Sequence, residues 1–223
     1  MTTTIFPSIL SADFTNLADN IKECESAGAT GIHIDVMDGQ FVPPITFGPL
    51  LVKSINPITN LILDVHMMVA NPGRYFDELS AAGADSVSFH FESSENVLSD
   101  LNHLLDLGIS RSLAINPETS IDEVKPFLSS LDQILIMSVK PGYGGQKFIS
   151  DSLIKINNLK KLLQNEKSSI KIQVDGGINI DTVAQVVSAG ADSVVAGSAV
   201  FNLDNSITEN IKSILSVLRN KDY

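Results

Sequence analysis

The stretch that decides the fold is Ser26-Ala27-Gly28-Ala29-Thr30-Gly31-Ile32-His33-Ile34-Asp35, in which a glycine separates a helix-like segment from a short apolar one. The same order recurs at Ala81-Ala82-Gly83-Ala84-Asp85, at Leu107-Gly108-Ile109 and at Ser188-Ala189-Gly190-Ala191-Asp192. We expect each glycine to end a helix, where a left-handed residue is favoured. Each apolar run that follows has the composition of a buried parallel strand. The pattern therefore predicts a chain of alternating helices and strands.

The spacing of these glycines predicts how many such units there are. Gly28, Gly83, Gly108 and Gly190 are separated by 55, 25 and 82 residues, which correspond to two, one and three units. A unit of about 27 residues agrees with the length of a βα repeat. Eight units fill the 223 residues without a linker. We therefore expect one α/β domain over residues 1–223, a (β/α)8 or TIM barrel.

A doubly wound open sheet is the rival architecture. Its dinucleotide-binding form has a glycine-rich turn after the first strand. Here that position holds Ser11-Ala12-Asp13-Phe14, which contains no glycine. The barrel is therefore preferred.

The periodicity also gives approximate element positions. The predicted strands cover residues 5–11, 31–37, 61–69, 86–91, 112–116, 133–139, 171–175 and 193–197. The predicted helices cover residues 14–27, 48–55, 73–82, 95–107, 121–130, 150–165, 180–189 and 205–219. The second helix is the least regular prediction, because Pro49 and Pro57 bracket it.

Composition excludes several classes of protein. The formal net charge is −11 and Lys160-Lys161 is the only adjacent basic pair, so we expect no nucleic-acid partner. No apolar run approaches the roughly 18 residues that span a bilayer, so we expect no membrane association. The start of the chain lacks the pattern of a signal peptide, and Cys24 is the single cysteine. Both features favour a cytoplasmic protein without disulfides.

Four residues at the predicted strand ends form a candidate metal site. Strand alternation places His33 and Asp35 on one face at the end of the second strand. His66 ends the third strand in the same phase, and Asp175 ends the seventh. In a (β/α)8 barrel these ends meet at the mouth. Two imidazoles and two carboxylates suit one divalent ion: zinc, Fe(II), Mn(II) or Co(II).

Each of these residues taken singly has a simpler explanation. A histidine on a strand is more often a hydrogen-bonded core residue than a ligand. An aspartate at a strand end more often caps the next helix. The metal site is favoured because four such residues share one phase. His90 also ends a strand but has no carboxylate in phase with it, so we expect a structural role, and we place His103 on a helix.

Glycines follow the last three predicted strands. They stand in Pro141-Gly142-Tyr143-Gly144-Gly145-Gln146, in Gly176-Gly177 and in Gly197-Ser198. Glycine lets the backbone approach a ligand closely. TIM barrels commonly bind phosphate with the loops after strands seven and eight. An acidic chain that binds an anion needs such local devices, and the cluster therefore predicts a phosphate site.

A metal, two carboxylates and a phosphate site together indicate a reaction class. The metal would polarise a ketone or enediolate oxygen of a small phosphorylated sugar. One carboxylate would remove a proton from the adjacent carbon, and the other would return a proton to the opposite face. Two groups on opposite sides are suited to epimerisation, whereas an isomerase that works on one face needs a single base.

The chain resembles the ribulose-phosphate 3-epimerase family over nearly its whole length, from Pro7-Ser8-Ile9-Leu10-Ser11-Ala12-Asp13-Phe14 to Ala196-Gly197-Ser198-Ala199-Val200-Phe201. Matching motifs include His33-Ile34-Asp35-Val36-Met37-Asp38-Gly39 and Leu63-Asp64-Val65-His66-Met67-Met68-Val69. Pro141-Gly142-Tyr143-Gly144-Gly145-Gln146-Lys147-Phe148 and Val174-Asp175-Gly176-Gly177-Ile178 match as well. The resemblance implies interconversion of D-ribulose 5-phosphate and D-xylulose 5-phosphate in the pentose phosphate pathway.

The resemblance also implies roles for individual residues. Asp35 and Asp175 would be acid/base catalysts and, with His33 and His66, would bind the metal. Ser8 and His66 would contact the sugar. The phosphate would be held by Gly142, Tyr143, Gly144, Gly145, Gly177, Gly197 and Ser198, and Gly176 would also bind the substrate. The sulfur-containing residues Met37, Met68 and Met137 would line the pocket. We further expect a homo-oligomer.

Two departures from the family pattern and three alternatives bear on this reading. Met67 stands where many members have Leu, but alternation turns it away from the metal face. Lys140 stands where Asn or Glu is common, and a lysine there could serve a Schiff-base aldolase. An epimerase acting on a ketohexose phosphate such as allulose 6-phosphate would use the same catalytic residues. A non-catalytic sugar-phosphate-binding protein would lack a carboxylate, and both are present.

Overall fold

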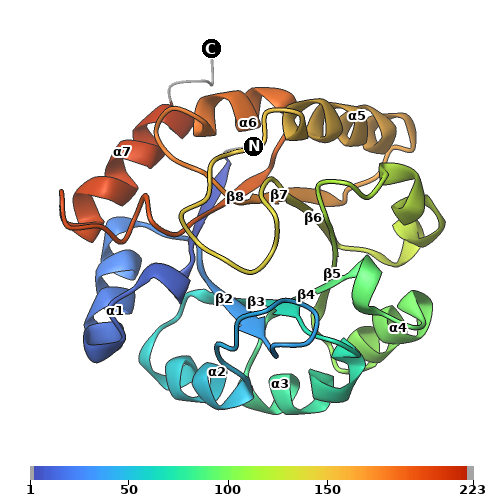
Figure 1. The fold of residues 1–223 in the computed structure, drawn as a ribbon, viewed down its shortest axis with the longest axis horizontal. Coiled ribbons are helices and arrows are strands. Elements are labelled where there is room, and N and C mark those ends of the chain that lie inside the picture. Colours follow the sequence, from blue (N-terminus) through green and yellow to red (C-terminus); the bar gives the residue numbers. More distant parts are fainter. Residues whose placement is uncertain (1–2, 220–223) are drawn as a thin grey trace.

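Eight parallel strands form a barrel in the computed structural model, which describes residues 3–219 (Figure 1). The strands are β1 Thr4–Pro7, β2 Gly31–Met37, β3 Ile62–Met68, β4 Ser86–His90, β5 Ser110–Ile115, β6 Gln133–Met137, β7 Lys171–Asp175 and β8 Ser193–Ala196. The predicted α/β fold, a TIM barrel, is confirmed. Residues 1–2 and 220–223 of the predicted domain lie outside the described residues.

The strands pair in the order β1-β8-β7-β6-β5-β4-β3-β2. The barrel closes between β1 and β2 through a parallel bridge from Ser8 to His33. Across the other pairs the register brings the carboxyl ends together: Asp35 lies beside His66, and Met137 beside Asp175. Because all strands are parallel, these ends form one mouth, and the side chains that leave them converge there.

The helices surround the barrel, as Figure 1 shows. They are α1 Leu17–Ala27, α2 Pro49–Ile55, α3 Phe76–Ala82, α4 Val97–Asp106, α5 Ser152–Asn165, α6 Val183–Ala189 and α7 Ile207–Arg219. The four glycines of the repeated pattern, Gly28, Gly83, Gly108 and Gly190, all have positive φ. Glycine adopts this conformation at no steric cost, and it ends the helix before the next strand.

Most element boundaries differ from the prediction by one to three residues, and three differences have a clear local cause. The first strand ends at Pro7, because the Ser8 side chain accepts a hydrogen bond from the Leu10 backbone and starts a short 3-10 helix. The third helix begins at Phe76, after a 3-10 turn over Pro72–Tyr75. The predicted fifth helix is entirely 3-10 over Ile121–Ser130, where Pro126 removes a backbone donor.

The main apolar core lies between the strands and the surrounding helices. Its most buried large side chains include Phe76, Phe89, Ile32 and Ile34. Two smaller apolar clusters lie at the mouth, one around Met37 and Met68 and one around Met137. Within residues 3–219, no helix has both the length and the apolar character that a membrane crossing requires.

Candidate active site at the carboxyl ends of the strands

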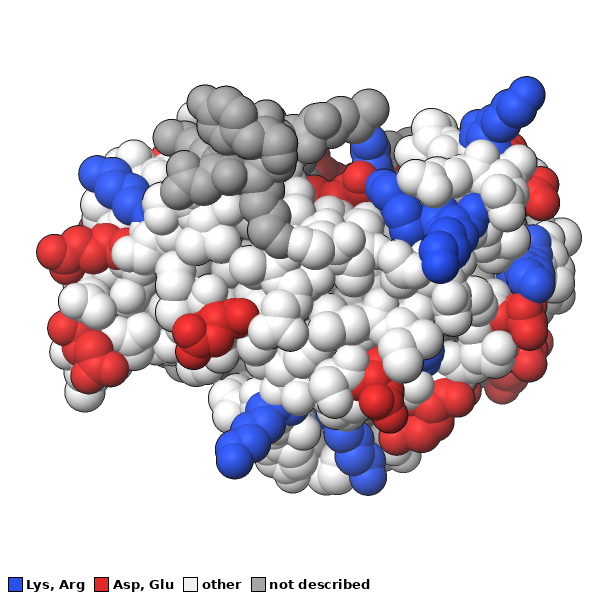
Figure 2. Space-filling view, turned by 90° about the horizontal axis from the view of Figure 1, so that it is seen from above, with Lys and Arg blue, Asp and Glu red and all other residues white. Residues whose placement is uncertain are grey.

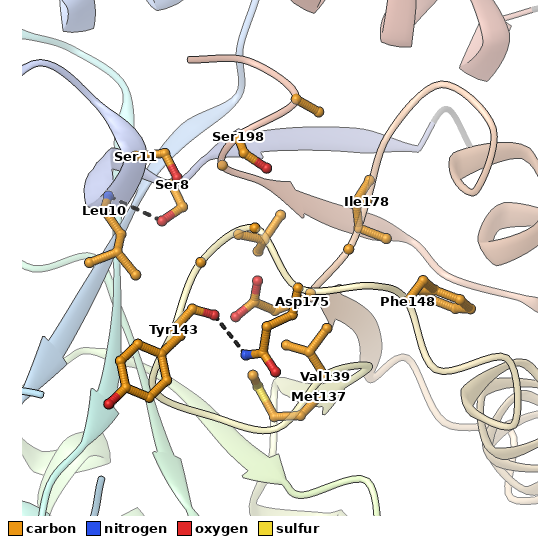
Figure 3. A pocket seen from close by; sticks show the side chains of 18 of the residues that line it. Ser8, Leu10, Ser11, Met137, Val139, Tyr143, Phe148, Asp175, Ile178 and Ser198 are labelled. Atoms are coloured by element: carbon orange, nitrogen blue, oxygen red, sulfur yellow. Dashed lines mark hydrogen bonds between the residues drawn. The ribbon is translucent and has the colours of Figure 1, made fainter. Parts of the chain in front are cut away.

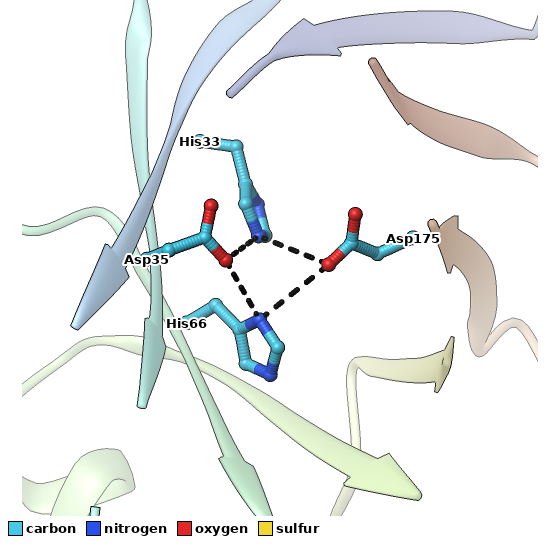
Figure 4. Close-up of side chains that lie close together, drawn as sticks. All are labelled: His33, Asp35, His66 and Asp175. Carbon is cyan, nitrogen blue, oxygen red and sulfur yellow. Dashed lines mark hydrogen bonds and ion pairs between the residues drawn. The ribbon is translucent and has the colours of Figure 1, made fainter. Parts of the chain in front are cut away.

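The four predicted metal ligands come together at the barrel mouth (Figure 4). One nitrogen or oxygen of each of His33, Asp35, His66 and Asp175 lies within 4.8 Å of the others. Asp35 Oδ1 lies 3.5 Å from His33 Nε2 and 3.2 Å from His66 Nδ1. Asp175 Oδ2 lies 4.0 Å and 3.7 Å from the same two nitrogens. The carboxylates thus occupy opposite corners of a quadrilateral, with an imidazole at each other corner.

This arrangement fits a tetrahedral divalent ion. Donors about 2.0–2.1 Å from a metal lie about 3.4 Å apart, close to the four edges observed here. His33 Nε2 is buried and has no hydrogen-bond partner among the described residues. A buried polar atom without a partner is costly. An ion between the four donors would satisfy it.

The ring nitrogen of His33 that faces away from the quartet contacts a further carboxylate, that of Asp64. His33 Nδ1 lies 2.8 Å from Asp64 Oδ2, and Asp64 Oδ2 also accepts a hydrogen bond of 2.9 Å from Gln173. All three side chains are buried. Metal-bound histidines commonly donate their other ring nitrogen to a carboxylate, which fixes the ring and its tautomer. Asp64 shares a face with His66 by alternation, but we assigned it no role from the sequence.

His66 is held by a longer chain of polar groups. His66 Nε2 lies 2.9 Å from His90 Nε2, and His90 Nδ1 lies 3.1 Å from Glu92 Oε2. We expected no carboxylate in phase with His90, but Glu92 stands two residues further on and contacts it. Glu92 lies beyond the end of β4, on the short 3-10 helix Phe91–Ser93, and we did not count it with the strand.

The two outer groups of that chain, His90 and Glu92, differ in charge state. Desolvation lowers the pKa of His90 to about 4, so its imidazole is neutral near pH 7. Burial works in the opposite direction on Glu92 and is outweighed by its hydrogen bonds to His90, Thr119 and the Asn116 backbone. These bonds lower the pKa of Glu92 to about 2, and its carboxylate is ionised.

The two catalytic candidates have pKa values displaced in opposite directions. Burial alone would raise the pKa of Asp35, but the charge and hydrogen bonds of His33 and His66 lower it well below the usual value. Ser8 Oγ adds a hydrogen bond of 2.5 Å to Asp35 Oδ2. Burial, reinforced by the charge of Asp35, raises the pKa of Asp175 to about 7. In the metal-free site near neutral pH, Asp35 is therefore ionised while the Asp175 carboxyl can hold a proton.

A cavity of about 570 Å³ opens directly above the quartet. Both aspartates line it, whereas His33 and His66 are buried beneath. The other predicted binding and pocket residues that line it are Ser8, Met37, Met68, Met137, Gly142, Tyr143, Gly144, Gly145, Gly176, Gly177, Gly197 and Ser198. Figure 3 shows Ser8, Ser11 and Ser198 along one wall, across the cavity from Asp175 and Met137.

Backbone of the loops after β6, β7 and β8 forms part of the cavity wall, the loop end. Gly142, Gly145, Gly176 and Gly177 all have positive φ, which L side chains rarely adopt. A Cβ added at Gly177 would lie 2.5 Å from the backbone nitrogen of Phe148, so the loops after β6 and β7 touch there. Backbone amides can therefore approach a ligand closely at this end.

Ser11 lies between two of the glycines and was missed from the sequence. A Cβ added at Gly197 would lie 2.8 Å from Ser11 Oγ, and one at Gly144 would lie 3.4 Å from it. Ser11 belongs to the 3-10 turn that replaces the end of the predicted first strand. A strand register would have directed this side chain differently, so the wrong boundary concealed its place in the site.

The loop after β6 is closed by Gln146. Its amide nitrogen donates to the carbonyls of Lys140 and Tyr143, at 2.7 and 2.8 Å. The Tyr143 side chain is 61% exposed at the tip of the loop. Lys147 lines the cavity and is a cation that our sequence analysis did not assign.

Lys140 lies outside the cavity, although it follows β6 directly. Its side chain is exposed, and the residues that line the cavity include Val139 and Pro141 but not Lys140. A Schiff-base lysine needs desolvation beside its substrate. The aldolase alternative is therefore not favoured.

Acidic and basic side chains are interspersed on the face in Figure 2. The formal net charge of the chain is −11. That the protein has no nucleic-acid partner stays an expectation from this charge.

Comparison with known proteins gives concordant results. A family model described as the ribulose-phosphate 3 epimerase family matches residues 4–201. A ribulose-phosphate 3-epimerase of Bacillus subtilis is 44% identical over 198 residues, covering 88% of this chain and 91% of the relative. One from Synechocystis is 46% identical over 203 residues, covering 90% and 88%. The chloroplastic enzyme of Arabidopsis thaliana is 42% identical over 212 residues, covering 94% and 75%.

Solved structures with low sequence identity share the barrel. The 3-keto-L-gulonate-6-phosphate decarboxylase of Vibrio cholerae superposes with a TM-score of 0.74 at 14% identity, covering 99% of both chains. The tryptophan synthase alpha-subunit of Pyrococcus furiosus gives 0.70 at 15% identity, covering 98% of both. These similarities show the fold alone. The family match and the close relatives, together with the His/Asp quartet at the barrel mouth, establish that the chain belongs to the ribulose-phosphate 3-epimerase family of isomerases.

Proposed function

We propose that Asp35 and Asp175 are the two acid/base groups that interconvert D-ribulose 5-phosphate and D-xylulose 5-phosphate at carbon 3. The observation that carries this assignment is their position at opposite corners of the His/Asp quartet, on β2 and β7. A substrate carbon between them would present one face to each carboxyl. One group would remove the proton, and the other would donate a proton to the opposite face.

The two carboxyls differ in the metal-free site. Asp35 has a strongly lowered pKa and is ionised, whereas burial and the charge of Asp35 raise the pKa of Asp175 to about 7. A bound divalent ion would lower the pKa of both carboxyls, because its positive charge favours the ionised form. In the reverse reaction the roles of proton acceptor and donor exchange. Efficient proton transfer requires pKa values near the working pH, and burial of Asp175 moves its carboxyl in that direction. Ser8 orients Asp35 through its hydrogen bond to Oδ2.

We assign one divalent ion to His33 Nε2, Asp35 Oδ1, His66 Nδ1 and Asp175 Oδ2, with zinc, Fe(II), Mn(II) and Co(II) all compatible with this donor set. When bound, such an ion supplies charge stabilisation for the ketone and enediolate oxygens of the substrate. The remaining walls would keep water away from the reacting carbon. Met37, Met68 and Met137 are almost fully buried and line the cavity beside the carboxylates.

We assign the phosphate to the loop end of the cavity. Gly144, Gly177, Gly197 and Ser198 line it, and their backbones can present amide donors to the phosphate oxygens. In a chain with a net charge of −11, such local donors must outweigh the general repulsion of an anion. Phosphate bound there would fix the sugar with its ketone end toward Asp35 and Asp175.

The relatives at 44% and 46% identity carry the ribulose-phosphate name, so the ketohexose-phosphate alternative is not favoured.

A homo-oligomer and a cytoplasmic location stay predictions. Analytical ultracentrifugation and fractionation of cells would test them.

The deciding experiment is an epimerisation assay with both pentulose phosphates after chelation and after metal add-back. We expect chelation to abolish turnover, about one equivalent of metal per chain to restore it, and allulose 6-phosphate to react more slowly. Metal content is measured in the same samples. Full turnover in metal-free protein would remove the proposed metal site, and absence of turnover in metal-loaded protein would remove the proposed reaction.

A further inference from the structure

The two candidate metal-binding histidines face the metal position with different ring nitrogens. His33 presents Nε2 and has its Nδ1 beside Asp64. His66 presents Nδ1 and has its Nε2 beside His90. A neutral imidazole carries its single proton on one nitrogen only, and that nitrogen cannot bind a metal. Each histidine is therefore a ligand only in one tautomer, and the two need opposite tautomers.

For His33 the tautomer is set directly. The Asp64 carboxylate accepts hydrogen bonds and cannot donate one when it is ionised. It therefore holds the proton of His33 on Nδ1, at 2.8 Å, and leaves the Nε2 lone pair free. No such carboxylate touches Nε2 of His66 in the described structure, where the neighbour at 2.9 Å is another imidazole. An imidazole can donate or accept, so this contact alone sets nothing.

Glu92 determines which nitrogen donates in the contact between His66 and His90. Glu92 Oε2 lies 3.1 Å from His90 Nδ1, so the proton of His90 lies on Nδ1. His90 Nε2 is then an acceptor, and His66 Nε2 must be the donor. The proton of His66 is thereby held on Nε2, and its Nδ1 lone pair faces the metal position.

We propose that Glu92 is a positioning residue that fixes, through His90, the tautomer in which His66 can bind the metal. The inference rests on the proposed metal site and adds a residue outside the quartet. A contact within the site favours the other tautomer of His66. Asp35 Oδ1 lies 3.2 Å from His66 Nδ1 and would hold the proton on that nitrogen. The chain from Glu92 supplies the competing acceptor on the far side of the ring.

Glu92 is itself fixed in place. Its Oε1 accepts hydrogen bonds from the Asn116 backbone, at 2.8 Å, and from the Thr119 hydroxyl. The loop that carries these donors is held by Lys155, whose ammonium donates to the carbonyls of Asn116, Pro117 and Thr119 at 2.6–2.8 Å. Oε1 of Glu92 is thus occupied by hydrogen bonds from the loop, and Oε2 is free to accept a hydrogen bond from His90.

Because the loop holds Oε1, a glutamine at position 92 can adopt only one orientation of its amide, and Glu92→Gln is therefore an informative variant. The side-chain oxygen of a glutamine must stay with the Asn116 N–H, because a backbone amide cannot become an acceptor. The NH2 group then faces His90 Nδ1 and donates to it. His90 moves its proton to Nε2 and donates to His66 Nε2, whose own proton shifts to Nδ1. The substitution therefore reverses both tautomers and blocks the ligand atom without removing any atom from the site.

The first measurement is zinc affinity by competition with a chromophoric chelator. We expect Glu92→Gln to weaken zinc binding by about 10–100-fold, the usual effect of losing an outer partner of a metal-bound histidine. Glu118→Gln is the matched control, because Glu118 is exposed in the 116–119 loop that contacts Glu92 and its substitution removes the same charge. It should stay within about twofold of the unsubstituted protein. Equal affinities for the two variants would overturn the inference.

The second measurement needs no variant and decides the matter if Glu92→Gln does not fold. The chain has four histidines, so imidazole 15N–1H correlation spectra of the zinc-loaded protein can be assigned. We expect His66 protonated on Nε2 and His90 on Nδ1. A His90 protonated on Nε2, or on both nitrogens, would overturn the inference. Failure of the unsubstituted protein to bind zinc would instead remove the proposed metal site, so the two failures are distinguishable.

Discussion

The two ends of the cavity are built in different ways. The end with the His/Asp quartet consists of side chains that leave strands, and His33, Asp35 and His66 are almost completely buried. The other end consists of loop segments, where Gly144, Gly177 and Gly197 line the cavity without side chains. The first end is rigid because the barrel register fixes it, as in the pairing of Asp35 with His66. The second depends on loop conformation.

This difference agrees with the function proposed for each end, proton transfer at the first and phosphate binding at the second. Proton transfer requires atoms held within a few tenths of an ångström, which strand-borne side chains with outer hydrogen-bond partners provide. Phosphate binding requires several donors around a large anion, which turns and glycine-rich loops provide at little steric cost. Substitutions at the strand end should therefore change chemistry, and substitutions at the loop end should change affinity.

The largest effect should follow from removing either carboxylate. Asp35→Asn and Asp175→Asn keep the shape of the side chain but remove the base, and each should reduce epimerisation by at least about 10²–10⁴-fold, the contribution of acid/base catalysis. In heavy water, each metal-bearing variant should still exchange the carbon-3 proton of one epimer with solvent, a different epimer for each variant.

Metal content must be measured in both variants, because each aspartate is also a proposed ligand. Near-normal epimerisation by a metal-bearing variant would show that its aspartate is not an essential acid/base group. Exchange of the same epimer in both variants would contradict the opposite-face arrangement.

A pH effect on stability should come next in size, and it tests the strand end alone. In metal-free protein the pKa of Asp175 is raised to about 7 by burial and by Asp35, against about 3.9 in an unfolded chain. This group therefore stabilises the fold below about pH 4, and that contribution is lost as the pH rises to about 7. Each unit of difference corresponds to about 1.4 kcal/mol, so the loss should be on the order of a few kcal/mol.

Urea denaturation with chelator at pH 4.5 and pH 8 measures this contribution. Asp175→Asn should gain stability relative to the unsubstituted protein on going from pH 4.5 to pH 8. A constant difference between the two proteins would mean that the Asp175 carboxyl titrates normally. No such pH-linked difference is expected for Gly144→Ala, which changes the loop end.

At the loop end, Gly144→Ala should raise the Michaelis constant and spare the turnover number. An added Cβ meets Ser11 Oγ at 3.4 Å and has no backbone strain to overcome, so the free protein should fold normally. The methyl group would stand where a phosphate must approach. Loss of one hydrogen bond to a charged group costs about 1.5–3 kcal/mol, or roughly 10–150-fold in kcat/KM.

Gly48→Ala is the matched control, since nothing lies within 4 Å of its added Cβ. It should leave kcat/KM within about twofold. A Gly144→Ala protein with an unchanged Michaelis constant would move the phosphate away from this loop.

The same contrast explains what could be predicted from the sequence. Strand alternation and glycine spacing were enough to place His33, Asp35, His66 and Asp175 together, because side-chain direction on a strand follows from position. Glu92 and Ser11 could not be placed in this way. Both lie on 3-10 turns just beyond strand ends, where direction depends on local hydrogen bonds such as that from Leu10 N to Ser8 Oγ.

The predicted type of element was wrong where a single residue outweighed the helical periodicity of the sequence. Residues 121–130 have helical spacing, but Pro126 leaves them in 3-10 geometry. Loop residues were identified by composition alone, so Lys140 and Lys147 could not be distinguished in the sequence. The structure places Lys147 on the cavity wall and Lys140 outside it, a consequence of the turn that Gln146 closes.

The smallest effect should therefore come from Lys140→Met, which removes a cation beside the loop end without entering the cavity. A lysine that formed a Schiff base would be indispensable, and its loss would abolish turnover. An exposed lysine outside the cavity should change kcat/KM by less than about twofold, because salt screens exposed charges. Lys147→Met is the matched comparison: it removes the same charge from the cavity wall and should raise the Michaelis constant severalfold. Steady-state kinetics of both variants at the same ionic strength compares them directly, because both lysines are exposed and salt screens both charges. A larger loss in Lys140→Met than in Lys147→Met would mean that the loop after β6 moves Lys140 into the site during turnover.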